Sequence, residues 1–110
     1  MPLNAGLLNR RVTIQMRVAS RDASGGVVET YTERATVWAD ARPMSGREVV
    51  AAGNLVASEM IEFTLRHRDD VEPTDRIVMD GRVFAIDYIA EIGLREGLRI
   101  VARRPAENAS

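Results

Sequence analysis

Thr36–Glu48 reads TVWADARPMSGRE: a strand-like segment with the chain's only tryptophan runs into Pro43 and then into a helix start. Ser45 and Glu48 form a capping box, because the Ser45 hydroxyl can accept from the Glu48 amide while the Glu48 carboxylate reaches back. Gly53 supplies a helix stop in the left-handed conformation. The pattern predicts a short helix over about residues 46–52 that projects from a small β domain.

Composition bounds the class of protein. The chain has 110 residues, 45% hydrophobic and 28% charged, which predicts one globular domain over residues 1–110 with a loose tail from residue 105. The net charge is -1, so no overall field favours nucleic acid or an anionic membrane. The chain contains no cysteine, which excludes disulfides and thiolate metal sites. No signal-peptide pattern or apolar run long enough to span a bilayer is present, so we expect a cytoplasmic protein without a membrane partner.

Alternation of apolar and polar residues predicts six strands. Val12–Val18 and Val27–Ala41 flank a turn cluster at residues 21–26, which predicts a long hairpin whose tip stands clear of the body. Asp80–Gly81 predicts a tight hairpin turn between two later strands. Further strands are predicted over residues 60–67, 77–79, 82–89 and 98–103. The fold class is therefore all-β: an antiparallel meander closing into a small barrel of about six strands, anchored by the Trp38 strand, with one short helix in the loop after strand two.

The sequence offers little chemistry for catalysis. His67, the only histidine, is in phase with Phe63 and Leu65, so a satisfied or rim histidine is favoured over a general base. An acidic turn could hold a hard cation but lacks the spacing of a calcium loop, and a solvated turn is favoured. That turn comprises Asp69, Asp70, Glu72 and Asp75. Ser24 and Ser45 have no plausible partner base. We therefore predict no catalytic, cofactor-binding or metal-binding residues, and a protein that is not an enzyme.

Lysine is absent, so all 15 basic residues are arginine, and several cluster along the chain. The clusters are Arg10–Arg11 with Arg17, Arg66 with Arg68, and Arg103–Arg104. Rim ion pairs with neighbouring carboxylates are the favoured interpretation. Electrostatic matching to a partner subunit or to passing DNA is the alternative. The second candidate function is accordingly a small β-barrel module that binds nucleic acid, although 5% aromatic residues leave few for base stacking.

The order of several short segments resembles the phage head–tail joining (head closure or stopper) proteins over about residues 5–104. The segments are Gly6–Leu7, Arg11–Gln15, Arg21–Asp22, Gly25–Thr30, Val37–Ala39, Pro43, Ser45–Glu48 and Arg76–Ile86. The resemblance implies a β-barrel that forms a homo-oligomeric ring, sixfold or twelvefold, below a portal or adaptor protein and above a tail terminator or tail tube protein. Such a ring closes the DNA-filled head, docks the tail and contacts packaged DNA transiently and non-specifically. It belongs to the virion of a phage or of a phage-like particle such as a gene transfer agent, assembled in the bacterial host cytoplasm.

The resemblance also implies two groups of candidate site residues. In stopper members the loop after the second strand points into the DNA channel, which corresponds here to residues 43–58. The channel-loop or interface candidates are Arg42, Met44, Ser45, Gly46, Arg47, Glu48 and Asn54. The hairpin-tip interface candidates are Arg21, Asp22, Ser24, Gly25 and Gly26. The small residues at 51–54 favour a hinge over a rigid plug, so a plug and a connecting ring both remain open.

Overall fold

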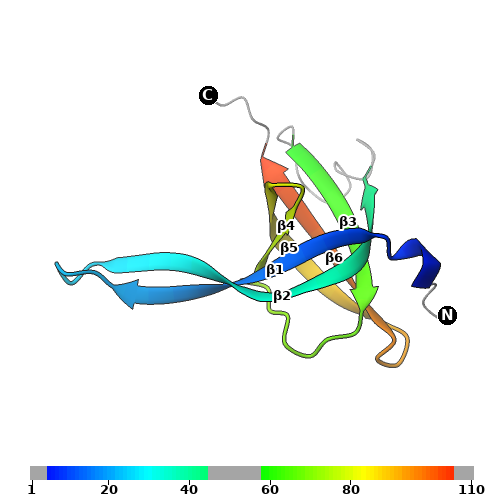
Figure 1. Cartoon of the computed structure of the whole chain (residues 1–110), viewed down its shortest axis with the longest axis horizontal. Coiled ribbons are helices and arrows are strands. Elements are labelled where there is room, and N and C mark those ends of the chain that lie inside the picture. Colours follow the sequence, from blue (N-terminus) through cyan, green and yellow to red (C-terminus); the bar gives the residue numbers. More distant parts are fainter. Residues whose placement is uncertain (1–4, 45–57, 106–110) are drawn as a thin grey trace.

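The computed structural model describes residues 5–44 and 58–105 (Figure 1). A single turn of 3-10 helix, η1, precedes six strands. The elements are η1 (Ala5–Leu7), β1 (Arg10–Arg21), β2 (Val27–Pro43), β3 (Ser58–Arg66), β4 (Arg76–Met79), β5 (Arg82–Ile92) and β6 (Gly97–Pro105). The all-β prediction is confirmed, and the six strands lie close to their predicted positions. The predicted helix over residues 46–52 lies outside the described residues.

The strands form one antiparallel sheet in the order β1-β2-β3-β6-β5-β4, and pairing of β1 with β4 closes it into a barrel. The prediction of a simple meander is wrong. β3 pairs with β6, and β4 pairs with β1, so the chain between β3 and β4 passes across two intervening strands. Residues 67–75, which include the acidic turn expected at 69–75, form this crossing connection. A closed order leaves no sheet edge within the barrel.

Alternation along the strands fills the barrel. Ile61, Phe63 and Leu65 are buried on one face of β3, as their period of two predicts. Phe63 meets Phe84 of β5 edge to face, with ring centroids 5.8 Å apart and planes at 74°. This is a preferred geometry for aromatic pairs. The remaining members of the core cluster are Val12, Ile14, Ala39, Ile77, Met79, Leu98, Ile100 and Ala102.

Two local features follow the sequence closely. Asp80 and Gly81 both have positive φ, 53° and 77°, as the mirror-image turn of a tight hairpin requires. In β5 the register with β6 skips Asp87, which stands in a β-bulge and contacts Arg103 at 3.2 Å. A bulge thus accommodates Asp87, the charged residue in the middle of this largely apolar strand.

β1 and β2 extend far beyond the barrel as a two-stranded arm (Figure 1). β1 contacts β4 only over Thr13–Gln15, and β2 contacts β3 only over Ala39–Pro43. Beyond these stretches the two strands pair only with each other, from Met16↔Thr32 to Arg21↔Val27. The long hairpin with a projecting tip is therefore present.

Trp38 itself lies on the outside of the barrel, although its strand contributes to the core. Ala39 is fully buried, and Val37 and Ala41 pack against the core. Because side chains alternate along a strand, Trp38 points outward, and 52% of it is exposed. The small and aliphatic residues on either side, not the indole, anchor this strand.

Candidate functional site

The tip of the arm is an ordered turn built around Asp22. Its Oδ1 accepts hydrogen bonds from the amides of Ser24 (2.9 Å) and Gly26 (2.7 Å). Arg21 donates to the Gly25 carbonyl oxygen at 3.1 Å, and Gly25 has a φ of 87°. Aspartate and glycine are typical of such turns because the carboxylate caps nearby amides and glycine adopts positive φ without strain. The structure brings all five predicted hairpin-tip residues together in one turn.

The two edges of the arm carry no strand partner within the described residues, and several apolar side chains are exposed along it. Val27 is 68% exposed, and Val18 and Val28 are also exposed. One ion pair, Arg17–Glu29 at 3.5 Å, crosses the ribbon. Unpaired strand edges offer backbone donors and acceptors that a partner chain can use.

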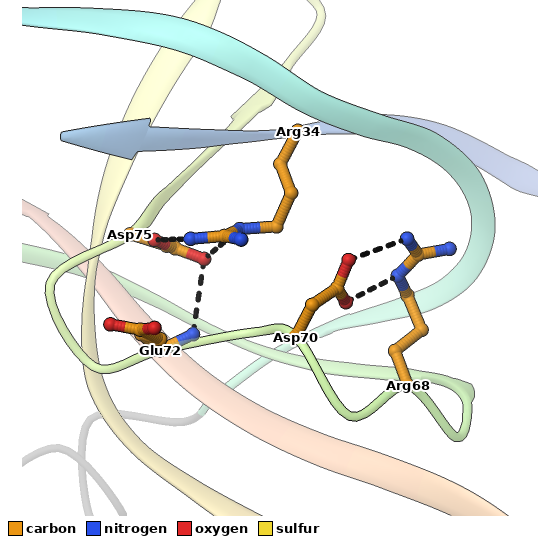
Figure 2. Close-up of polar contacts among 5 residues, drawn as sticks. All are labelled: Arg34, Arg68, Asp70, Glu72 and Asp75. Carbon is orange, nitrogen blue, oxygen red and sulfur yellow. Dashed lines mark hydrogen bonds and ion pairs between the residues drawn. The ribbon is translucent and has the colours of Figure 1, made fainter. Parts of the chain in front are cut away.

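The arm is fixed to the barrel at its base by Arg34. The β1–β2 register changes between Ile14 and Gln15, and the residue that it skips on β2 is Arg34. A β-bulge redirects the side chain of its extra residue. The Arg34 guanidinium reaches Asp75 through two hydrogen bonds, Nε to Oδ2 at 2.8 Å and Nη2 to Oδ1 at 3.0 Å (Figure 2). This hydrogen bonding raises the pKa of the Arg34 guanidinium above its ordinary value.

Asp75 is the one charged residue that the described structure buries, with 3% of it exposed. Its Oδ2 also accepts from the Glu72 amide at 3.0 Å (Figure 2). A buried carboxylate is tolerated when it is paired and its lone pairs are satisfied. Asp75 therefore joins the crossing connection to the point where the arm leaves the barrel.

Arg76, the first residue of β4, makes a second connection to the base of the arm. Its Nε donates to Gln15 Oε1 at 2.7 Å. Its guanidinium carbon lies 3.6 Å from the centre of the Tyr31 ring, a cation–π contact. Gln15 and Tyr31 belong to β1 and β2, so Arg76 contacts both strands of the arm.

The acidic turn uses its carboxylates in ion pairs with arginine. Arg68 binds Asp70 through two hydrogen bonds of 3.0 and 2.9 Å, and Arg95 contacts Asp69 at 2.8 Å. Hydrogen bonding from Arg68 lowers the pKa of Asp70 below its ordinary value. Among the described residues no group of side chains has the arrangement of a metal site. The expected solvated turn is thus a network of ion pairs.

His67 is held by carboxylates at the rim of the barrel. Its Nε2 lies 3.0 Å from Glu91 and 3.6 Å from Asp69. This position fits the interpretation as a satisfied or rim histidine.

The second predicted group is described only in part. Arg42 donates to Asp40 at 2.9 Å, and the Met44 amide donates to the Met60 carbonyl oxygen at 2.9 Å. The remaining members of this group, Ser45, Gly46, Arg47, Glu48 and Asn54, lie outside the described residues. Four residues at the base of the arm were not among the predicted site residues: Arg34, Gln15, Tyr31 and Arg76. Asp75 was predicted to lie in a solvated turn and is buried instead. The bulge has no local sequence signal, and these contacts join residues distant along the chain.

A match to a protein-family model covers the barrel and the arm together. A family model described as phage head completion protein matches residues 3–105, which include the arm, its base and all six strands. The chain belongs to this family.

Among the described residues, no helix is long and apolar enough to cross a bilayer.

One curated relative and two solved structures are similar to this chain. The chain is 32% identical over 75 residues to head completion protein gp7 of Enterobacteria phage HK97, covering 68% of this chain and 67% of gp7. It is similar to the solution structure of protein SF1141 from Shigella flexneri 2a, with a TM-score of 0.77 and 31% identity over 96% of this chain and 100% of that one. It is also similar to a chain in the virion of a native gene transfer agent particle, with a TM-score of 0.65 and 26% identity over 90% and 96% of the two chains. A structural role in a virion is therefore supported for this head completion protein.

Proposed function

We propose that this head completion protein forms a homo-oligomeric ring between the portal or adaptor of a phage or gene transfer agent and its tail. In that position it closes the DNA-filled head and provides the surface on which the tail docks. It acts without catalysis. The single observation that carries the proposal is the family match over residues 3–105, which spans the barrel and the arm together.

The arm supports an assembly role because it is ordered at both ends and open along both edges. Asp22 fixes the tip, and Arg34 with Arg76 fixes the base. A two-stranded ribbon is marginally stable alone, so fixed ends maintain a shape that a partner can recognise. We assign the tip residues Arg21, Asp22, Ser24, Gly25 and Gly26 to contact with a neighbouring subunit or with the adaptor. A head-to-tail contact of this kind generates a ring when its rotation closes.

The loop over residues 43–58 is the candidate for the channel side of the ring. The loop begins at Pro43, the last residue of β2, which pairs with Ile61 of β3. Contact with DNA there needs to be weak, because DNA must pass through the channel, and each additional phosphate contact strengthens binding and its salt dependence.

The alternative role, a nucleic-acid-binding module, has less support. The predicted arginine clusters are largely ion-paired, as in Arg10–Asp80 at 2.6 Å, Arg68–Asp70 at 2.9 Å and Arg104–Glu59 at 3.6 Å. Paired arginines offer little free charge to a phosphate backbone.

The proposal is tested in a phage or gene transfer agent that carries this gene. We expect deletion of the gene to yield heads without tails in negative-stain electron micrographs, and the wild-type gene to restore tailed particles. A variant in which residues 18–30 are replaced by Asn-Gly joins the paired residues Arg17 and Tyr31 through a two-residue turn. It shortens the arm and keeps its base, so we expect it to fold and to fail to restore tails. Normal tail attachment without the gene would contradict the role in the particle. Normal attachment with the shortened arm would contradict the assignment of the arm.

A further inference from the structure

Two arginines stand apart from the others in the described part of the chain. Every other arginine there makes a hydrogen bond or ion pair, for example Arg10 with Asp80 or Arg103 with Asp87. Arg11 and Arg66 have none within the described ranges. Arg11 contacts only the face of Trp38, with its guanidinium carbon 5.1 Å from the ring centre. Unpaired guanidinium groups are unexpected in a chain whose carboxylates outnumber its arginines by 16 to 15.

Both of these arginines flank the exposed Trp38. Arg11 is its direct partner on β1, and Arg66 follows Leu65, which pairs with Ala39 on β3. Trp38 and Arg66 together line two neighbouring surface hollows of about 400 and 390 Å³. One hollow is completed by Leu8 and Asn9, and the other by Val37, His67 and Arg68. We call Arg11, Trp38 and Arg66 the tryptophan patch.

The chemistry of the tryptophan patch defines what it binds. Two unpaired cations on either side of an exposed indole fit two anionic groups flanking an apolar one. Tryptophan and arginine are also the residues most enriched among the energetically dominant positions of protein interfaces. The cations come from strands that flank β2, so their backbones lie about 10 Å apart, twice the spacing of neighbouring strands.

The surroundings favour a protein over DNA as the source of the anions. Two free charges release few counterions, whereas proteins that bind duplex DNA neutralise about 6–10 phosphates. Carboxylates contact two of the residues that line the second hollow: Asp69 and Glu91 lie beside His67, and Asp70 pairs with Arg68. These carboxylates repel the continuous negative charge of a DNA backbone more strongly than a short segment that carries two separate carboxylates.

We propose that the tryptophan patch is a docking site for an extended acidic segment of a partner protein, with carboxylates two residues before and two residues after an apolar side chain. Alternate residues of an extended segment share one face, so this spacing presents all three groups to the patch. The three residues of the tryptophan patch are not among those assigned above to the arm tip or to the 43–58 loop, and the proposal goes beyond the ring proposed above.

The test uses the single tryptophan as its reporter. The indole N–H of Trp38 gives the only indole signal in an amide-correlated NMR spectrum, because the chain has one tryptophan. We titrate the full chain at 150 mM NaCl with the peptide Ac-ETLTE-NH2, its neutral counterpart Ac-QTLTQ-NH2, and a 12-base-pair DNA duplex. The acidic peptide is expected to shift the indole signal and to saturate with a Kd of about 1 mM. The neutral peptide is expected to bind at least fivefold more weakly.

Two variants show whether the arginines are responsible. Arg11→Gln with Arg66→Gln removes the free charges and is expected to weaken acidic-peptide binding at least fivefold. Arg103→Gln removes an exposed arginine paired with Asp87 and is expected to leave binding unchanged. The proposal is overturned if 10 mM acidic peptide leaves the indole signal in place, if the double variant binds equally well, or if DNA binds at least tenfold more tightly than the peptide. The titration uses the isolated chain, so its failure leaves the proposed ring standing.

Discussion

Arg34 holds Asp75 through two parallel hydrogen bonds of 2.8 and 3.0 Å, although the two residues lie 41 positions apart in the chain. The pair joins the bulge at the base of the arm to the connection that crosses the barrel end (Figure 2). A bidentate pair of this kind fixes orientation as well as distance. It therefore determines the direction in which the arm leaves the barrel.

The first prediction concerns the stability that depends on this pair. Asp75→Ala leaves Arg34 without its carboxylate partner in a partly buried position and removes the acceptor of the Glu72 amide. Breaking a buried pair costs about 3–5 kcal/mol, which urea unfolding measures. Asp75→Asn keeps an acceptor for the Glu72 amide, so it should lower the free energy of unfolding by less than Asp75→Ala does. The control Arg82→Ala breaks an exposed pair with Glu59 and costs less than about 1 kcal/mol. An Asp75→Ala cost as small as that of the control would contradict this role.

The second prediction concerns the stiffness of the arm. Arg76→Lys keeps the positive charge but loses the planar group that lies over Tyr31. We expect faster amide hydrogen exchange along Met16–Arg21, because the arm opens more often at its base. A double-mutant cycle with Tyr31→Leu should give a coupling energy of about 0.5–2 kcal/mol. Arg99→Lys, whose ion pair with Glu62 lies on the barrel, serves as the control. Unchanged exchange in the arm would show that Arg76 does not fix it.

The third prediction concerns the tip. Gly25→Ala places a side chain at a φ of 87°, and Asp22→Ala removes the acceptor of two amides. Both changes should increase protease cleavage within residues 22–26 and leave the urea midpoint of the barrel nearly unchanged, because the tip contacts no barrel strand. Ser24→Ala is the matched control, since its hydroxyl makes no hydrogen bond within the described residues. Equal cleavage in all three variants would contradict the proposed order of the tip.

The fourth prediction concerns pH. Hydrogen bonding from Arg68 lowers the pKa of Asp70 in the folded protein below its ordinary 3.8. A group with a depressed folded pKa contributes stability above its unfolded pKa, and that contribution is lost as the pH falls through the folded pKa. Arg68→Gln should raise the Asp70 pKa toward 3.8 and remove this part of the acid sensitivity. An NMR titration of the Asp70 carboxyl measures the change. An Asp70 pKa that stays low in the variant would assign the shift to another group.

The strands were predictable because each carries its own signal. Alternation located the strands predicted over residues 12–18 and 60–67, and the Asp80–Gly81 pair located a tight turn whose positive φ angles the structure shows. The strand order was not predictable in this way, because pairing of β3 with β6 depends on contacts that no local pattern encodes. The turn at the arm tip was predictable for the same reason as the strands. Asp22 and the two glycines that form it lie within five consecutive residues, so the signal is local.

The base of the arm shows what sequence patterns leave out. Asp75 belongs to an acidic stretch, and local composition indicates a solvated turn. It is buried only because Arg34 arrives from a bulge on a distant strand. The outward position of Trp38 does follow from a local pattern, because the alternation of Val37, Ala39 and Ala41 toward the core places the indole outside.

The most direct test of the central claim is cryo-electron microscopy of the assembled particle, with density assigned to this chain. We predict a ring of six-stranded barrels between the portal or adaptor and the tail, with each arm contacting a neighbouring subunit or the adaptor. Absence of the chain from the completed particle, or its presence only outside the junction of head and tail, would contradict the account.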